Sequence, residues 1–193
     1  NTNSSIWILK AFQPESQIAI FGTAQQLATF LMIQQNIVIF VLSPEIASLY
    51  ASGQTRKLEK LLRRTAGLAL IPTLIGYAIF LGGGRRILAL LYGEFYTAGY
   101  GVLLVLSFGY LFHVFAGSCG LTLLMTGNQN DLMLISVVTA LITLGVGILT
   151  VNVFGVLGVA LAATVGFLIK NTWMVIRVKQ RIGIWTFASM SLK

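Results

Sequence analysis

The side chains of this sequence that could bind a polar ligand are mainly amides. Five of them lie within one stretch, from Ile18 to Leu42, that contains no charged residue: Gln25, Gln26, Gln34, Gln35 and Asn36. An amide both donates and accepts hydrogen bonds, and burying it in an apolar environment without a partner is costly. On a helix these positions form a broad stripe along one side. The stripe either lines a polar cavity or bonds to neighbouring helices, and the sequence leaves both interpretations open.

Three further polar side chains lie inside apolar runs, namely His113, Lys170 and Asn171. His113 has no second histidine beside it, so it is either a hydrogen-bonded packing residue or a proton relay. Lys170 lies six residues before Arg177, and its long stem either reaches the membrane surface or brings the ammonium group to a ligand's charged head. We include all three as candidates for lining a cavity.

No arrangement of residues in the sequence is typical of an enzyme. The acidic residues fall in loops or at helix ends, which leaves no carboxylate pair within an apolar segment: Glu15, Glu45, Glu59, Glu94 and Asp131. There is no zinc-protease, nucleophile-triad or phosphate-loop motif. Cys119 is the one cysteine, so it cannot form a disulfide within this chain, and we interpret it as a packing residue. We expect no catalysis, no metal site and no cofactor.

The composition predicts an all-α, multi-pass membrane protein. Hydrophobic residues make up 56% of the chain and charged residues 9%, and the mean hydropathy is +0.87. A soluble domain would carry about 25% charged residues. The run from 18 to 42 alone would extend roughly 37 Å as a helix, which is enough to cross a hydrocarbon layer of about 30 Å. No separate soluble domain is expected.

The apolar runs predict five complete spans, at about 18–42, 67–81, 102–125, 132–151 and 156–176. Residues 6–12 resemble the end of a further helix, and 177–193 are expected to form a cytoplasmic tail in water or along the interface. We expect Pro44 to end or kink the first span. The GGGRR sequence at 82–86 is expected to interrupt the second span, and the aromatic segment that follows it to form an interfacial re-entry loop.

The distribution of the basic residues predicts how the chain is oriented in the membrane. Nine of the 13 Lys and Arg residues fall on the side formed by segments 43–66, 126–132 and 177–193, which is therefore expected to be cytoplasmic. Residues that we assign to lipid headgroups and topology are Arg56, Lys57, Lys60, Arg63 and Arg64 on this side, and Arg85 and Arg86 on the other. Membrane lipids are thus the expected partners of the basic residues. The net charge of +8 needs no nucleic acid to explain it.

Three stretches carry a resemblance to a known family. They are AIFGTAQQLATF followed by VLSPEIASLYASGQTRKLEKLLRRT, then ILALLYGEFYTAGYGVLLVLSFGYLF, and LTLLMTGNQND. Together they resemble the polysaccharide (O-antigen, Wzx-type) flippases of the MOP exporter superfamily, which also contains the lipid II flippases and the MATE drug exporters. The resemblance covers residues 17–131 well and the remaining spans by register.

The resemblance implies the C-terminal half of a transporter with about twelve spans in two pseudo-symmetric bundles. It further implies a missing N-terminal transmembrane bundle as partner, a polyprenyl-pyrophosphate-linked glycan as substrate, alternating access as mechanism and the bacterial inner membrane as location. The glycan and any coupling ion stay open. Two alternatives also remain: a MATE-type cation-coupled drug exporter, and a non-transporting membrane scaffold of a polysaccharide assembly complex.

Overall fold

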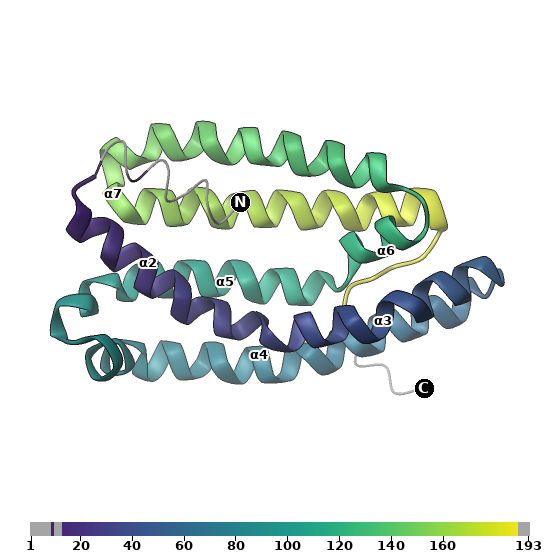
Figure 1. Ribbon diagram of the computed structural model, residues 1–193, viewed down its shortest axis with the longest axis horizontal. Helices are drawn as coiled ribbons and strands as arrows, with labels where there is room; N and C mark the ends of the chain where they lie inside the picture. The colour runs from purple at the N-terminus through teal and green to yellow at the C-terminus, as the bar shows by residue number, and fades with distance from the viewer. Residues whose placement is uncertain (1–8, 10–12, 189–193) are drawn as a thin grey trace.

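The computed structural model describes residue 9 and residues 13–188, and every regular element in that part of the chain is a helix (Figure 1). The elements are α2 (Glu15–Thr29), η1 (Phe30–Met32), α3 (Ile33–Ala51), α4 (Thr55–Tyr92), η2 (Glu94–Gly99), α5 (Tyr100–Ala116), α6 (Cys119–Met125) and α7 (Gln129–Ile182). Four helical stretches are long and apolar enough to cross a membrane. The expected all-α, membrane-type fold is confirmed. The helix end expected at 6–12 lies outside the described residues, apart from Leu9.

The first helical stretch joins α2, η1 and α3 and runs from Glu15 to Ala51. Of the two alternatives expected at Pro44, an end and a kink, the end is wrong, because Pro44 lies inside α3. A proline within a helix removes one backbone hydrogen bond. The hydroxyl of Ser43 donates to the carbonyl of Ile39 at 2.6 Å, so the side chain adds a hydrogen bond one turn from the proline. The helix therefore continues for two more turns.

The second stretch, α4, also continues through a predicted boundary. We expected GGGRR to end the span near Leu81 and the next residues to form a re-entry loop, but α4 is helical from Thr55 to Tyr92 and stops only at Gly93. The segment that carries the five basic residues from Arg56 to Arg64 is the first part of the same element. Three consecutive glycines weaken a helix by about 1 kcal/mol each relative to alanine, but tertiary packing overrides that preference here. Gly84 is buried against the ring of Tyr100.

The predicted third span is broken in the middle. α5 ends at Ala116, Gly117 has a φ of 75°, and α6 begins at Cys119. A Cβ atom on residue 117 would collide with the backbone carbonyl of Thr186, so glycine is required for both its backbone conformation and its size. The break leaves carbonyl groups at the end of α5 that need new partners.

The last element, α7, is a pair of helices that reverses direction at Gly155, where φ is 55° and ψ is −133°. Its 54 residues would reach roughly 80 Å as one straight helix, which is more than twice the thickness of a hydrocarbon core. Figure 1 shows its two halves running side by side in opposite directions. The hydroxyl of Thr150 donates to the carbonyl of Gly158 at 3.0 Å across the turn.

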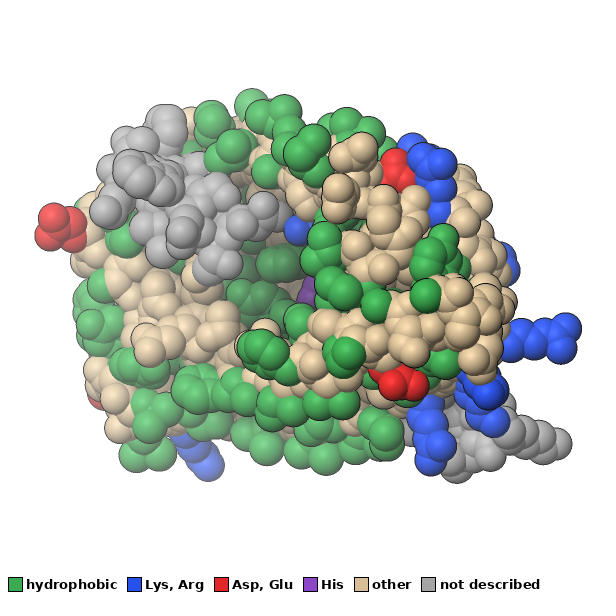
Figure 2. Space-filling view, turned by 45° about the vertical axis from the view of Figure 1, so that its right-hand side comes forward, with side chains coloured by type: hydrophobic (Ala, Val, Ile, Leu, Met, Phe, Trp, Pro, Cys, Tyr) green, Lys and Arg blue, Asp and Glu red, His purple; other side chains and the backbone are tan. Residues whose placement is uncertain are grey.

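The three predicted cytoplasmic segments meet at one end of the bundle. The turn after α3, the loop between α6 and α7 and the end of α7 lie together at the right of Figure 1, whereas η2 and the turn at Gly155 lie at the left. We call the end that holds the three predicted cytoplasmic segments the basic end, because Figure 2 shows most of the Lys and Arg side chains there. At this end, Nη1 of Arg63 lies 3.5 Å from Oε1 of Glu59, which forms an ion pair between residues four apart on α4.

A second ion pair at the basic end joins the two ends of α7. The Nε of Arg181 lies 2.8 Å from Oδ2 of Asp131, just outside the apolar run that starts at Leu132. The hydrogen bond from Arg181 lowers the pKa of the Asp131 carboxyl below its usual range. The contribution of this pair to stability is therefore present at neutral pH and is lost as the pH falls through that lowered pKa.

The C-terminal segment differs from the tail that was expected in water or along the interface. After α7 ends at Ile182, residues 184–188 return to the bundle, and Ile184 and Thr186 are buried. The amide of Ala188 donates to the carbonyl of Phe115 at 2.8 Å, and the hydroxyl of Thr186 donates to that of Ala116 at 3.0 Å. These bonds supply the partners that the break after α5 requires. Residues 189–193 lie outside the described part of the chain.

The two halves of α7 pack so closely that one added methyl group at their contact should destabilise the protein. Gly166→Ala would place Cβ against the side chain of Thr143, so we expect it to lower the free energy of unfolding by about 1–3 kcal/mol. The matched control is Gly145→Ala on the same element, where no atom lies within 4 Å of the new Cβ. The measurement is the thermal unfolding midpoint in detergent. Adding Thr143→Ala should restore part of the loss; equal midpoints for the two glycine variants would contradict this packing.

Candidate functional site

The core of the bundle consists of two apolar clusters. The first contains Phe21, Leu31 and Leu103, and the second contains Leu42 and Leu123. The second cluster lies toward the basic end, because it also includes residues from the first turns of α4 and the last turns of α7: Leu58, Leu62, Met174 and Val178.

A polar layer separates the two apolar clusters. On α5, Tyr110 belongs to the first cluster and Ala116 to the second, and His113 lies between them. In the second half of α7, Asn171 occupies the same position between Phe167 and Met174. The polar layer consists of six residues, from four helices and from the break between α5 and α6: Gln34, Gln35, Thr73, His113, Ser118 and Asn171.

The centre of the polar layer is a contact between His113 and Asn171. Nδ1 of His113 lies 2.7 Å from Oδ1 of Asn171, and the amide nitrogen of Asn171 donates to the carbonyl of Phe167 at 2.8 Å. The thiol of Cys119 donates to the same Asn171 oxygen at 3.9 Å. The Asn171 oxygen accepts, so the proton of this bond lies on Nδ1 of His113. The second ring nitrogen of His113 is then left for another partner.

Two amides of α3 connect the polar layer to other helices. The side chain of Gln35 is buried and donates to the hydroxyl of Ser118 at 3.4 Å, immediately after the break that ends α5. Gln34 donates to the hydroxyl of Thr73 on α4 and to the carbonyl of Leu31 at 2.6 Å. Both residues therefore join helices, and the interhelical interpretation of the amide stripe applies to them.

The other amides of the predicted stripe lie apart from this layer. Gln25 is half-buried on α2, about two turns before Gln34, and Gln26 and Asn36 are exposed. Within the described part of the chain, the side chains of these three residues form no hydrogen bond. They remain candidates for contact with a ligand or a further bundle, but the structure does not bring them to the His113 contact.

Lys170 precedes Asn171 on α7 and is half-buried. Its charge is close enough to influence both His113 and Cys119. Figure 2 shows a hollow in one face of the bundle. A Lys or Arg side chain (blue) and the chain's single histidine (purple) are visible inside it. The polar layer is therefore accessible from this face, and a positively charged side chain lies in the same hollow.

The available groups favour binding over bond chemistry. The layer offers amide, hydroxyl and imidazole groups with a nearby ammonium group, all of which form hydrogen bonds to sugar hydroxyls or phosphate oxygens. Among residues 13–188, no group of three His, Cys, Asp or Glu side chains is placed to hold a metal ion. The hollow lies between helices, where these groups could bind a polar ligand.

The headgroup candidates lie away from this layer. Arg56, Lys57, Lys60 and Arg64 are exposed on the first turns of α4 at the basic end, and Arg63 is half-buried there. Arg85 and Arg86 are exposed near the other end of α4. Their contact with lipid stays a prediction.

Comparison with known proteins points to polysaccharide synthesis. Over 165 residues the chain is 26% identical to the capsular polysaccharide biosynthesis protein CapF of Staphylococcus aureus, covering 86% of this chain and 42% of that protein. The chain thus spans less than half the length of this relative. No family model and no solved structure matches the chain. The similarity supports a polysaccharide-related role, in agreement with the coarser part of the sequence prediction.

Two residues of the polar layer were missed by the sequence analysis, Thr73 and Ser118. Both lie within predicted apolar spans, where a single hydroxyl does not stand out. For Ser118 a signal was present, because Gly-Ser within a span is a common site of helix breaks. For Thr73, the neighbouring Pro72 marked a place where backbone and side-chain hydrogen bonds rearrange. Cys119 was expected to be a packing residue, and it is buried in the second apolar cluster.

The contact between His113 and Asn171 predicts a measurable coupling. In a double-mutant cycle with His113→Ala and Asn171→Ala, we expect an interaction energy of about 0.6 to 1.7 kcal/mol, the range for hydrogen bonds within membrane proteins. The measurement is the unfolding free energy in mixed detergent micelles. The control cycle replaces His113→Ala with Gln26→Ala, and distant sites should be additive. Equal coupling in both cycles would contradict the contact.

Proposed function

We propose that the complete protein flips a lipid-linked oligosaccharide across the bacterial inner membrane, and that this chain supplies one of its two helical bundles. The observation that carries the proposal is the polar layer around His113 and Asn171, which opens to a hollow in an otherwise apolar bundle. The similarity to a capsular polysaccharide biosynthesis protein supports a glycan as the cargo.

The mechanism we infer needs no bond to be made or broken. A lipid-linked glycan has a polar, anionic head and an apolar tail, and only the head needs a path through the hydrocarbon layer. Amide and imidazole groups provide alternative hydrogen-bond partners for the head, and Lys170 provides positive charge for its phosphates. Alternating exposure of the hollow to the two sides would follow from rocking of this bundle against the second bundle.

Lys170 provides the sharpest test of this proposal. The complete gene should restore surface glycan to a strain that lacks its own flippase, and Lys170→Gln should reduce that restoration about tenfold, as expected for losing one charge-assisted hydrogen bond. The control is Lys179→Gln on the same helix, whose ammonium group lies over Trp185 at the basic end and away from the polar layer. The measurements are surface glycan and the lipid-linked precursor retained inside the cell.

Other outcomes would redirect the assignment. Normal surface glycan with Lys170→Gln, at equal protein levels, would place the ammonium group at the membrane surface instead of on the cargo. Failure of the unaltered gene together with resistance to cationic dyes would favour a drug exporter. Failure of the unaltered gene in both assays would favour a narrow sugar specificity or a non-transporting scaffold.

A further inference from the structure

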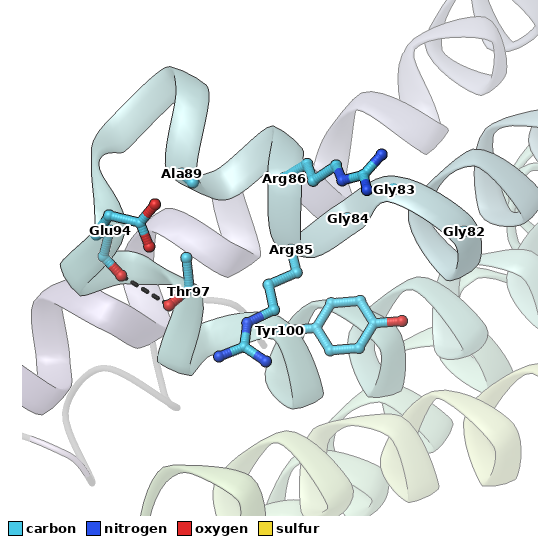
Figure 3. A pocket seen from close by; sticks show the side chains of 9 residues that line it. All are labelled: Gly82, Gly83, Gly84, Arg85, Arg86, Ala89, Glu94, Thr97 and Tyr100. Carbon is cyan, nitrogen blue, oxygen red and sulfur yellow. Dashed lines mark hydrogen bonds between the residues drawn. The ribbon is translucent and has the colours of Figure 1, made fainter.

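A second hollow lies at the opposite end of the bundle from the basic end, where α4 passes into η2 (Figure 3). It has a volume of about 520 Å³. Its polar lining comes from three elements: Arg85 and Arg86 from α4, Glu94 and Thr97 from η2, and Tyr100 from α5. We refer to it as the outer pocket. It is separate from the polar layer, because none of its lining residues belongs to that layer.

The shape of the outer pocket follows from the glycine run of α4. Gly82, Gly83 and Gly84 continue the helix without side chains and leave room above its backbone. The hydroxyl of Tyr100 donates to the carbonyl of Leu81 at 2.8 Å, which fixes the aromatic ring beside the glycines. The same three residues that were expected to break the helix therefore form one wall of a binding space.

Among the described residues, no ion pair neutralises the two arginines of the outer pocket. In the described part of the chain, ion pairs involve Arg63 with Glu59 and Arg181 with Asp131, and neither Arg85 nor Arg86 forms one. Figure 3 shows their side chains leaving consecutive positions of α4 in different directions. Both arginines nevertheless line the same pocket, so each guanidinium group can meet an anion there. Arginine forks match the geometry of phosphate oxygens.

The pocket also contains an acid, which a simple anion site would not favour. Glu94 lines the pocket beside Thr97, whose hydroxyl donates to the backbone carbonyl of Glu94 at 2.7 Å. An ionised carboxylate only accepts hydrogen bonds, so it prefers a ligand that brings hydroxyl groups. A ligand with one phosphate and adjacent hydroxyls satisfies both the arginines and the acid.

We propose that the outer pocket binds a phosphate ester that carries neighbouring hydroxyl groups, with Arg85 and Arg86 on the phosphate oxygens and Glu94 on a hydroxyl. Two membrane components offer this chemistry. One is the headgroup of an anionic glycerophospholipid such as phosphatidylglycerol, and the other is the sugar phosphate part of a lipid-linked glycan. The inference rests on the pocket itself and does not require that the protein flips lipids.

The test measures binding to the complete protein in zwitterionic detergent, by calorimetric titration. One arm uses short-chain phosphatidylglycerol, and a second arm uses a short-chain isoprenyl pyrophosphoryl sugar. We expect saturable binding of at least one probe, weakened about tenfold or more by the double variant Arg85→Gln/Arg86→Gln, because two charge-assisted contacts are lost. The matched control, Arg56→Gln/Lys57→Gln, removes two charges from the basic end and should keep the site.

Glu94→Gln separates the role of the acid from that of the arginines. This variant removes a negative charge, so inorganic phosphate should bind more tightly, whereas the hydroxyl-bearing probe should bind more weakly because its acceptor is poorer. Tighter binding of both would overturn the assignment of Glu94 to a hydroxyl. Protein recovered as a single species on gel filtration would confirm that each variant is folded.

The two arms identify the source of the ligand. Saturable binding of phosphatidylglycerol that depends on the arginines would assign the pocket to a bilayer lipid, and binding of the sugar probe alone would assign it to the lipid-linked glycan. No saturable binding of either probe, or equal losses in the arginine variant and its basic-end control, would overturn the proposal. Because binding is measured without transport, these results stand whether or not the protein proves to be a flippase.

Discussion

A polar group inside a hydrocarbon layer has no water to bond with, and this constraint shapes the whole bundle. Every polar side chain at mid-depth needs a partner from another element or from a ligand. The structure meets the requirement with pairs between helices, such as His113 with Asn171 and Gln35 with Ser118. Within the described part of the chain, the buried side-chain polar atoms that lack a partner are the Ser107 hydroxyl and the Arg63 Nε. The polar layer is therefore part of the packing between helices.

The same constraint explains how the helices can be interrupted. The break at Gly117 frees the carbonyls of Phe115 and Ala116, and the returning segment bonds both. At η1, the amide of Gln34 bonds the carbonyl of Leu31 where the helix tightens. Each irregularity lies beside a side chain or backbone group that replaces the missing bond. The interruptions at Gly117 and η1 thus lie beside the polar layer, because the interrupted backbone and the polar side chains both need hydrogen-bond partners.

The class of fold was predictable because composition and apolar length are properties of the whole sequence. The helix boundaries at Pro44 and at the glycine run were not, because local propensity favours an end at both positions and packing against neighbouring helices decides otherwise. For the candidate site, His113, Asn171, Gln34 and Gln35 were recognisable as polar residues in apolar runs. Their pairing was not, because it depends on which helices are neighbours. Ser118 and Thr73 were missed, since a hydroxyl in a membrane helix usually bonds its own backbone.

The reversal of α7 at Gly155 has a consequence for how the chain enters the membrane. The turn, NVFGV, contains no charged residue, so it carries no signal that would hold it on either side. Its two helices are also in contact from the turn onward, through Thr150 and Gly158. Such a pair is suited to insertion as one helical hairpin. Its uncharged tip would cross the bilayer, and Asp131, Arg177 and Arg181 would remain on the side from which the hairpin inserts. The charged residues at the open end of the hairpin then determine the orientation of both helices together.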